Sequence, residues 1–232
     1  MWSGGFEFGD LWAAYRGPAG ENVAHAHVAV QVAIVGDGPP RIALADGEIT
    51  GAMLIVGPLL THRLVPESRS LGLLYLAPQA PLAAALLASI HPARAAAAPA
   101  ALVDAVRGTS PPHWAARLTA ATGAGAPVLD ARLAAALQTA AIDPAPGAVA
   151  RAAVAVGLSE PRLRAITRQQ LGAPLSQWLL WRKLEQAARA MAAGASLAAA
   201  AVDGGFADQA HFARTMKRMF GVTPAVAASV LR

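Results

Sequence analysis

Three histidines and a glutamine in the first third of the chain are residues whose types and spacing could do chemistry. His25 and His27 are separated by one residue, Gln31 follows His27 by four positions, and His62 lies further along. Side-chain direction along a β-strand repeats every two residues, so His25, His27 and Gln31 are predicted to share one face of a strand. Imidazole and amide groups gathered on one face could hold a metal ion or the polar groups of a small ligand.

This spacing resembles the cupin pattern, in which a His-x-His pair, a later acid and a more distant histidine bind a metal. Here Gln31 stands at the position of the acid, and residues 58–62 match the second part of the pattern only loosely. A neutral amide in place of a carboxylate weakens a metal site. The sequence therefore favours a small-ligand pocket over a metal and predicts no cofactor. The effector-binding candidates are His25, His27, Gln31 and His62.

Arginines at helical spacing form a second group of candidate residues. At 157–159 a glycine that ends one helix precedes a serine that begins the next, which is typical of a helix-turn-helix unit. In the predicted helix over 160–171, apolar residues recur on one face, and Arg164 and Arg168 lie on another. Such a helix could direct guanidinium groups at DNA phosphates and guanine edges, although a solvated basic face explains the same pattern.

The same arrangement occurs a second time before the end of the chain. A short helix is predicted over 196–203, a turn at 204–205, and a further helix over 208–220 that begins at Asp208. Apolar side chains at i, i+4, i+7 and i+8 predict a buried stripe on this last helix. Its basic face carries Arg214, Lys217 and Arg218. Two consecutive units with one architecture are far less expected by chance than a single unit.

A predicted helix over 174–193 joins the two units. At about 1.5 Å per residue it spans about 30 Å, and successive major-groove faces on one side of B-DNA lie about 34 Å apart. Trp178 and Trp181 are predicted to anchor this helix in the core. Its solvent or phosphate side is predicted to carry Arg182, Lys183 and Arg189.

Residues 205–214 and 220–224 resemble the signature of the second DNA-binding unit in the AraC/XylS family of transcription regulators. The first unit, over 153–172, is similar but less typical, because Thr167 stands where that family usually has an aromatic residue. The resemblance implies a sequence-specific DNA-binding regulator that responds to a small-molecule effector. It implies DNA-binding roles for Pro161, Arg162, Arg164, Ala165, Arg168, Gln209, Ala210, His211, Arg214, Lys217 and Arg218.

The residue types within that set suggest different roles. Gln209 suits adenine and Arg214 suits guanine, because each can make a bidentate contact with the base edge. Arg168, Lys217 and Arg218 are better placed for phosphates. His211 has a second interpretation, as a side chain that packs at the start of its helix.

The elements that must position these residues divide the chain into three parts. Short strands with Gly/Pro turns are predicted over 1–78, and mostly helices after them. The sequence predicts an α+β protein with a cupin-like antiparallel β-barrel for effector sensing at 1–78. A helical connector that could hold a homodimer together follows at 79–127. An all-α, AraC-type DNA-binding domain occupies 128–232, with two helix-turn-helix units joined by a long helix.

The charge distribution agrees with that division. Residues 1–130 carry 7 basic and 9 acidic residues, whereas 131–232 carry 12 basic and 5 acidic residues, within a net charge of +5. The basic part is predicted to meet a polyanion such as double-stranded DNA. The absence of cysteine excludes disulfides and thiolate chemistry. No apolar run is long enough to span a membrane, so a cytoplasmic protein without a membrane partner is expected.

Two other functions fit parts of the sequence. A metal-dependent cupin enzyme or sensor with an appended helical domain would use His25, His27 and His62. An architectural DNA-binding protein would need no effector. The sequence contains no nucleophile–base pair, P-loop or dinucleotide-binding motif, so a non-enzymatic regulator is the favoured interpretation.

Overall fold

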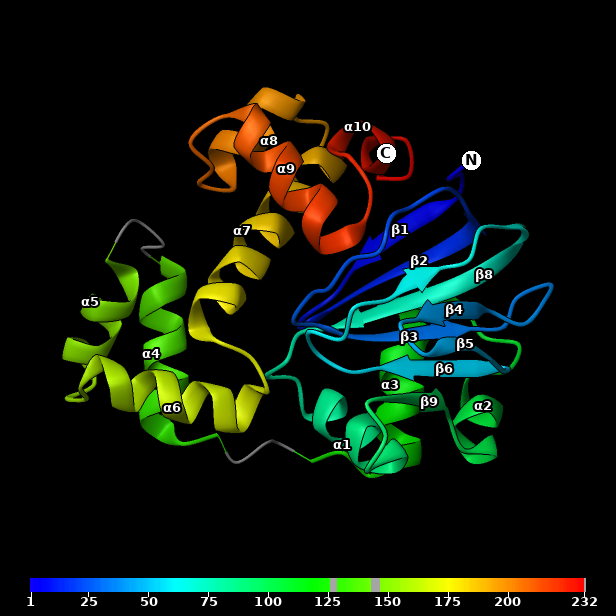
Figure 1. Cartoon of the computed structure of the whole chain (residues 1–232), viewed down its shortest axis with the longest axis horizontal. Helices are drawn as coiled ribbons and strands as arrows, with labels where there is room; N and C mark the ends of the chain where they lie inside the picture. The colour runs from blue at the N-terminus through cyan, green and yellow to red at the C-terminus, as the bar shows by residue number, and fades with distance from the viewer. Residues whose placement is uncertain (126–128, 143–146, 232) are drawn as a thin grey trace.

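The computed structural model describes residues 1–125, 129–142 and 147–231, and the boundary predicted at 127/128 lies outside them. Within residues 1–125 the strands form two antiparallel sheets, of order β1-β2-β8-β3-β6-β9 and β5-β4-β7 (Figure 1). The larger sheet consists of β1 (Gly5–Phe8), β2 (Trp12–Ala19), β3 (Val30–Ile34), β6 (Met53–Val56), β8 (Glu67–Leu76) and β9 (Ala95–Ala97). The smaller sheet consists of β4 (Arg41–Leu44), β5 (Gly47–Thr50) and β7 (Arg63–Leu64).

The expected antiparallel β-structure is confirmed, but the strands do not close into a barrel. In the described part of the chain β1 pairs only with β2, and β9 only with β6, so both are edges of the larger sheet. The strand β9 was not predicted, because alanine is depleted in strands. Its backbone nevertheless pairs with the open edge of β6, through Leu54–Ala97 and Val56–Ala95.

The two faces of the larger sheet bury different partners. Val30 and Val32 on β3 belong to the core under the helices α1 (Pro81–Ile90), α2 (Ala100–Val106) and α3 (Pro111–Thr122). Ala33, the residue after Val32, belongs to the core of the opposite face, as period-2 alternation requires. Figure 1 shows α1 and α3 lying against the first face. Gly72 on β8 permits the close approach of Trp114, since a Cβ there would overlap the indole ring.

The remaining helices form two helix-turn-helix units. They are α4 (Ala131–Ile142), α5 (Ala148–Ala155), α6 (Glu160–Leu171), α7 (Leu175–Ala192), α8 (Leu197–Asp203), α9 (Gln209–Phe220) and α10 (Pro224–Ala228). The predicted starts are confirmed, because Ser159, Ser196 and Asp208 each accept a hydrogen bond from the backbone N–H three residues later. None of the helices in the described residues is long and apolar enough to cross a membrane.

The long helix α7 joins the units, as predicted, over 18 residues and about 27 Å. Figure 1 shows it running from α6 at one end to α8 and α9 at the other. Trp178 belongs to the core of the first unit, with Leu163 and Leu133. Trp181 belongs to the core of the second unit, with Phe212. One rigid helix therefore contributes an aromatic side chain to each unit.

The core of the second unit is continuous with the core of the sheet. Phe206, Phe212 and Met219 lie in the same buried cluster as Leu73 and Tyr15 of the sheet. The first unit, by contrast, has its own cluster. The second unit and the larger sheet are therefore expected to be stabilised together.

Candidate nucleic-acid interface and effector site

The predicted DNA-contacting residues lie on the outer faces of α6 and α9. Leu163 and Ile166 are buried beneath α6, and Phe212 and Met216 beneath α9, so the basic faces turn away from the cores. The exposed members of the predicted set are Pro161, Arg162, Arg164, Ala165, Arg168, Gln209, Ala210, Arg214, Lys217 and Arg218. The polar faces of both helices are therefore exposed to solvent, where a binding partner can reach them.

Most of these cations have no ion-pair partner among the described residues. Arg164 is the exception, since its Nη2 lies 2.8 Å from Oε2 of Glu160 one turn earlier. An exposed pair at this spacing contributes only about 0.3–0.5 kcal/mol, so a phosphate or a base could displace it at low cost. The unpaired cations are Arg162, Arg168, Arg214, Lys217 and Arg218.

For His211 the structure shows the packing that the second interpretation predicted. It is half-buried, and its ring meets Phe206 edge-on with 5.3 Å between ring centroids. Its backbone N–H donates to Oδ1 of Asp208 at 2.6 Å, which fixes the start of α9. The ring therefore packs at the helix start and is still partly accessible.

The basic residues of α7, Arg182, Lys183 and Arg189, lie on an exposed or half-exposed side of the helix, and two of them also contact other segments of the chain. Arg189 Nη2 donates to the carbonyl of Gly9 at 2.7 Å, and its guanidinium lies 4.8 Å from the centre of the Phe8 ring. Lys183 Nζ donates to the carbonyl of Gly205 at 2.8 Å. Because these groups brace the helix against its neighbours, they are less available to DNA than those of α6 and α9.

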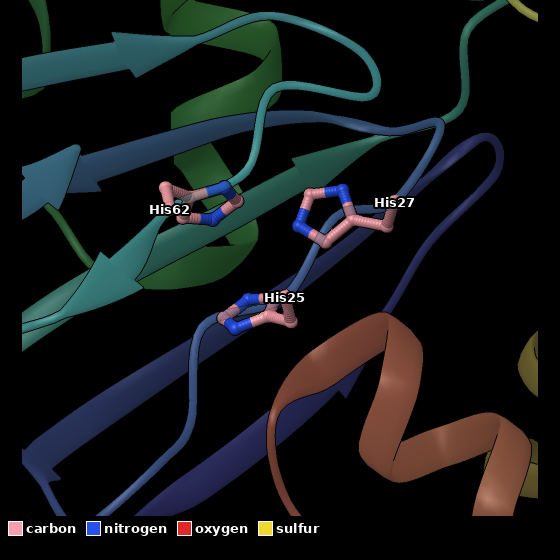
Figure 2. Close-up of side chains that lie close together, drawn as sticks. All are labelled: His25, His27 and His62. Carbon is pink, nitrogen blue, oxygen red and sulfur yellow. The ribbon is translucent and has the colours of Figure 1, made fainter. Parts of the chain in front are cut away.

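The structure brings together the four residues predicted as an effector site. Figure 2 shows the rings of His25, His27 and His62 close to one another, with centroids 4.5–5.7 Å apart. Nε2 of His27 and Nε2 of His62 both lie 3.1 Å from Oε1 of Gln31. His25 and His27 precede β3, and an isolated β-bridge pairs His25 with His62. The four residues lie together, but His25 and His27 precede β3, so they do not share a face of one strand as predicted.

Burial governs the charge of this cluster. All four residues are buried, with exposed fractions of 1–6%. Desolvation lowers the pKa of His25 to about 4, and the nearby His62 contributes to the shift. Burial also lowers the pKa of His62, and it lowers that of His27 well below its ordinary value. The three rings are therefore neutral at pH 7 and keep lone pairs available.

A cavity of about 100 Å³ lies between the sheet and the second unit, and the four predicted effector residues do not line it. Three residues of its wall, Tyr75, Trp181 and Phe220, lie against the ring of His27. Its walls are apolar apart from Glu185, and they come from both sides of this junction. Aromatic side chains that line it are Phe6, Phe8, Tyr75, Trp181 and Phe220. Sequence reasoning missed these residues as a site, and only the period-2 spacing of Phe6 and Phe8 indicates a shared face.

One polar group in this cavity wall has no partner. The indole N–H of Trp181 is buried and has no hydrogen-bond acceptor among the described residues. Leaving such a donor unpaired costs about 1–3 kcal/mol. A hydrogen-bond acceptor placed against this indole N–H would remove that cost.

Direct contacts join the segment before β3 and the larger sheet to the end of α9. The N–H of Val23 donates to the carbonyl of Gly221 at 3.0 Å. The Phe220 ring lies 5.6 Å from His27, 5.7 Å from Tyr75 and 5.6 Å from Trp181, centre to centre. The end of α9 is thus held by the histidine segment and by the cavity walls.

Comparison with known families identifies the helical part. Residues 152–228 match the family described as "Helix-turn-helix domain", and this range runs from within α5 to the end of α10. The carboxy-terminal part of the chain is an AraC-type helix-turn-helix domain. The resemblance drawn from residues 205–214 and 220–224 is therefore confirmed. No curated protein matches the sequence.

The whole chain shares its fold with ToxT from Vibrio cholerae. An apo form of ToxT has a TM-score of 0.65 at 10% identity, over 96% of this chain and 98% of that one. A form described as bound to an unsaturated fatty acid has a TM-score of 0.58 at 11% identity, over 98% and 97% of the two chains. The likeness shows a shared fold, in which a helix-turn-helix domain follows an antiparallel sheet.

Proposed function

We propose that this chain is a DNA-binding transcription regulator whose sensor sheet responds to an apolar small molecule. The observation that carries the proposal is the AraC-type domain, with two capped recognition helices that present exposed cations. Electrostatic attraction to phosphates dominates protein affinity for DNA, and base-edge contacts add specificity. The helices α6 and α9 supply both kinds of side chain.

The exposed residues divide by their position on each helix. Gln209, Ala210 and Arg214 on α9 occupy the early turns that meet base edges in helix-turn-helix proteins. Lys217 and Arg218, in the last turns, are placed for phosphates. On α6, Arg164 takes the base-reading role, because Ala165 offers only a methyl group.

Two variants of α9 test this division. Arg214→Ala is expected to relax sequence preference at one base step, since a bidentate arginine–guanine contact gives about 1–3 kcal/mol of discrimination. Lys217→Ala is expected to weaken binding to all sequences by a similar factor and leave the preference intact. Both side chains are exposed, so neither change should disturb the fold. The measurement is selection from a random duplex pool, followed by affinities for the selected duplex and its single-base variants.

Wild-type protein and Ala198→Ser, an exposed change on α8, serve as controls for that selection. If Arg214→Ala and Lys217→Ala change preference and affinity in the same way, the division of α9 is wrong. If neither changes the selected sequence or the affinity, α9 is not a recognition helix.

The cavity at the junction supports the effector part of the proposal. ToxT structures are described as bound to an unsaturated fatty acid and to a methylnaphthalenyl butenoic acid. Both molecules have an apolar body with a carboxylate, and the unpaired N–H of Trp181 could donate to such an oxygen. A cavity of about 100 Å³ is smaller than the roughly 300 Å³ of ordinary ligand pockets. A ligand with a long acyl chain would therefore fit only if the second unit moved relative to the sheet. Ligand binding would in this way change the position of α9.

An unsaturated fatty acid and its methyl ester are expected to raise the thermal midpoint of the protein, as any ligand of the native state does. An alkane of equal length should raise it less, because it offers no acceptor to Trp181. The variant Ala188→Phe, which fills the cavity, should abolish the shift. Ala192→Phe, on the exposed side of the same helix, should preserve it. Equal shifts in both variants would place the ligand elsewhere.

We also infer that the chain is not an enzyme, because a helix-turn-helix domain binds DNA. The alternative hypothesis is a cupin enzyme that uses the histidine cluster. The helices α1–α3 were expected to offer a dimer surface. Leu82 and Leu86 of α1 pack in the core of the chain's own sheet, so a second copy would have to use other residues.

A further inference from the structure

The face of the larger sheet opposite the second unit carries a second cavity, of about 770 Å³. Its walls come from the sheet, the end of α2, the loop over 108–110 and the first turns of α3. In Figure 1, α2 and α3 lie below the larger sheet and α9 lies above it. This cavity shares no lining residue with the one at the junction. Its volume falls within the roughly 300–1,000 Å³ of small-molecule sites.

A row of three residues on adjacent strands forms the floor of this cavity. Arg16 on β2 pairs with Gly72 on β8, and Gly72 pairs with Ile34 on β3. Ala14, two residues before Arg16, belongs to the core under the helices, so Arg16 points to that same face. Arg16 is exposed, which shows that the helices leave this end of the face uncovered. An arginine therefore occupies a position that an apolar residue fills elsewhere on the face.

Apolar side chains form most of the wall above this floor. The ring of Trp114 lies over Gly72, where a Cβ would overlap it. Nε1 of Trp114 donates to the carbonyl of Thr109 at 3.3 Å, which ties the ring to the loop as well. Val103 and Val106 of α2 complete this part of the lining. The cavity thus has firmly held apolar walls that can receive the body of an organic molecule.

The charged side chains that line the cavity are all basic. They are Arg16, Arg107 and Arg117, and no acidic residue of the described chain joins them. Arg16 and Arg117 have no ion-pair partner among the described residues, whereas Arg107 pairs with Asp104 at 2.8 Å. That pair is exposed and therefore weak, so an incoming anion could displace it. Guanidinium groups around one hollow attract anions and can pair with them bidentately.

We propose that this cavity binds a small organic anion, whose charged group pairs with Arg16 and Arg117 while its apolar body lies against Trp114. Ser110 Oγ and His113 Nδ1, which lie 3.0 Å apart, add hydrogen-bonding groups to the same wall. The proposal goes beyond the effector proposed for the junction, because the two cavities lie on opposite faces of the sheet.

A DNA duplex is the other anion that these arginines could meet. Two observations favour a small molecule. Arg16 lies on the floor of a hollow, and the walls around it are largely apolar, whereas a duplex phosphate needs no apolar wall. The cavity also lies on the face of the sheet that turns away from α9.

The position of the cavity gives a bound anion a consequence for the second unit. Tyr15 precedes Arg16 and Leu73 follows Gly72, and Tyr15 and Leu73 belong to the core that the sheet shares with the second unit. An anion that ties the sheet to α3 would therefore stabilise the strands against which α9 packs. This consequence rests on the proposed regulator function, whereas the binding site itself does not.

Fluorescence titration of the full-length protein with anilinonaphthalene sulfonate tests the site, because this probe joins an apolar body to one anionic group. We expect saturable binding with a rise in fluorescence. The uncharged phenylnaphthylamine, which has the same apolar body without the sulfonate, should bind about tenfold more weakly. Arg16→Gln and Arg117→Gln should each weaken binding of the sulfonate by about tenfold. Both side chains are exposed, so both variants should fold.

Two further variants serve as controls for the titration. Arg63→Gln removes a cation on β7 that does not line the cavity, and it should leave the affinity unchanged. Ala188→Phe fills the junction cavity and should also leave the affinity unchanged.

Three results would overturn the proposal. The first is the absence of saturable binding of the sulfonate by folded wild-type protein. The second is equal affinity in wild type, Arg16→Gln and Arg117→Gln, which would mean that the probe binds elsewhere. The third is weaker duplex binding by these two variants with unchanged binding of the probe, which would assign the arginines to DNA. The first two results leave duplex binding by α6 and α9 unaffected, so failure of this site and failure of the regulator function are distinguishable.

Discussion

The Phe212→Ala variant is expected to lose duplex binding and to unfold well below the wild-type temperature. Phe212 has no exposed surface, and its ring packs 5.2 Å from that of Phe206, centre to centre. Truncating a buried phenylalanine typically costs about 3–5 kcal/mol, through lost burial and the cavity that remains. For a chain of this size that loss lowers the thermal midpoint by roughly 6–20 °C.

The Phe212→Ala substitution is expected to affect the sheet as well as the second unit. Because Phe212 and the sheet residue Leu73 belong to one buried cluster, the loss should lower the stability of the sensor sheet as well. Circular dichroism should show the strands melting together with the second unit. Val202→Ala, at a side chain that is 73% exposed on α8, is the control and should change stability by less than about 0.5 kcal/mol. Unaltered melting of the strands in Phe212→Ala would contradict the shared core.

Gly221→Ala is expected to destabilise the chain by about 1–3 kcal/mol more than Gly172→Ala. Both glycines end a recognition helix in the left-handed conformation, with φ of 72° and 66°. An alanine at either place carries the same backbone strain of about 1–2 kcal/mol. The environments differ, since a Cβ at Gly221 would overlap the Val23 carbonyl and lie 2.7 Å from Nδ1 of His25. A Cβ at Gly172 would meet only Pro58, at 3.8 Å.

The difference between these two variants therefore reports on the docking of α9 against the sensor. Thermal midpoints of both proteins, measured in the same buffer, give it directly. Equal midpoints would mean that the second unit is not held against Val23 and His25 in solution.

The helical part could be predicted closely from the sequence because its determinants are local. A capping side chain and a terminal glycine act within four residues of each other, as at Ser159 and Gly172 around α6. The helix α6 was predicted over 160–171 and has those bounds in the structure. The helix α7 is two residues shorter than predicted, since Pro174 and Ala193 are its caps.

The junction could not be predicted, because its contacts join residues far apart in the chain. Arg189 reaches the carbonyl of Gly9, and Val23 reaches Gly221. Nothing in the residue types of Arg189 and Val23 indicates that their partners are the carbonyls of Gly9 and Gly221. The basic residues of α7 follow the same periodicity as those of α6, yet they brace the fold. Periodicity separates exposed faces from buried ones and does not say which exposed face meets another part of the same chain.

The histidine cluster could be predicted in part, less closely than the helices and better than the junction. The spacing of His25, His27 and Gln31 predicted a shared face, because strand geometry is local. The contribution of His62 depended on a weaker pattern, and the β-bridge between His25 and His62 explains its position. The proximity of Phe220 to this cluster had no counterpart in the sequence.

The central claim is that the exposed cations of α6 and α9 bind duplex DNA, and its most direct test is a salt titration of duplex affinity. The full chain should bind a selected duplex with an affinity that falls steeply as salt rises. Three phosphate contacts, from Arg168, Lys217 and Arg218, predict a slope of about −3 or steeper in a plot of log affinity against log salt. Lys217→Ala should reduce that slope by about one unit. No duplex binding, or an affinity independent of salt, would contradict the claim.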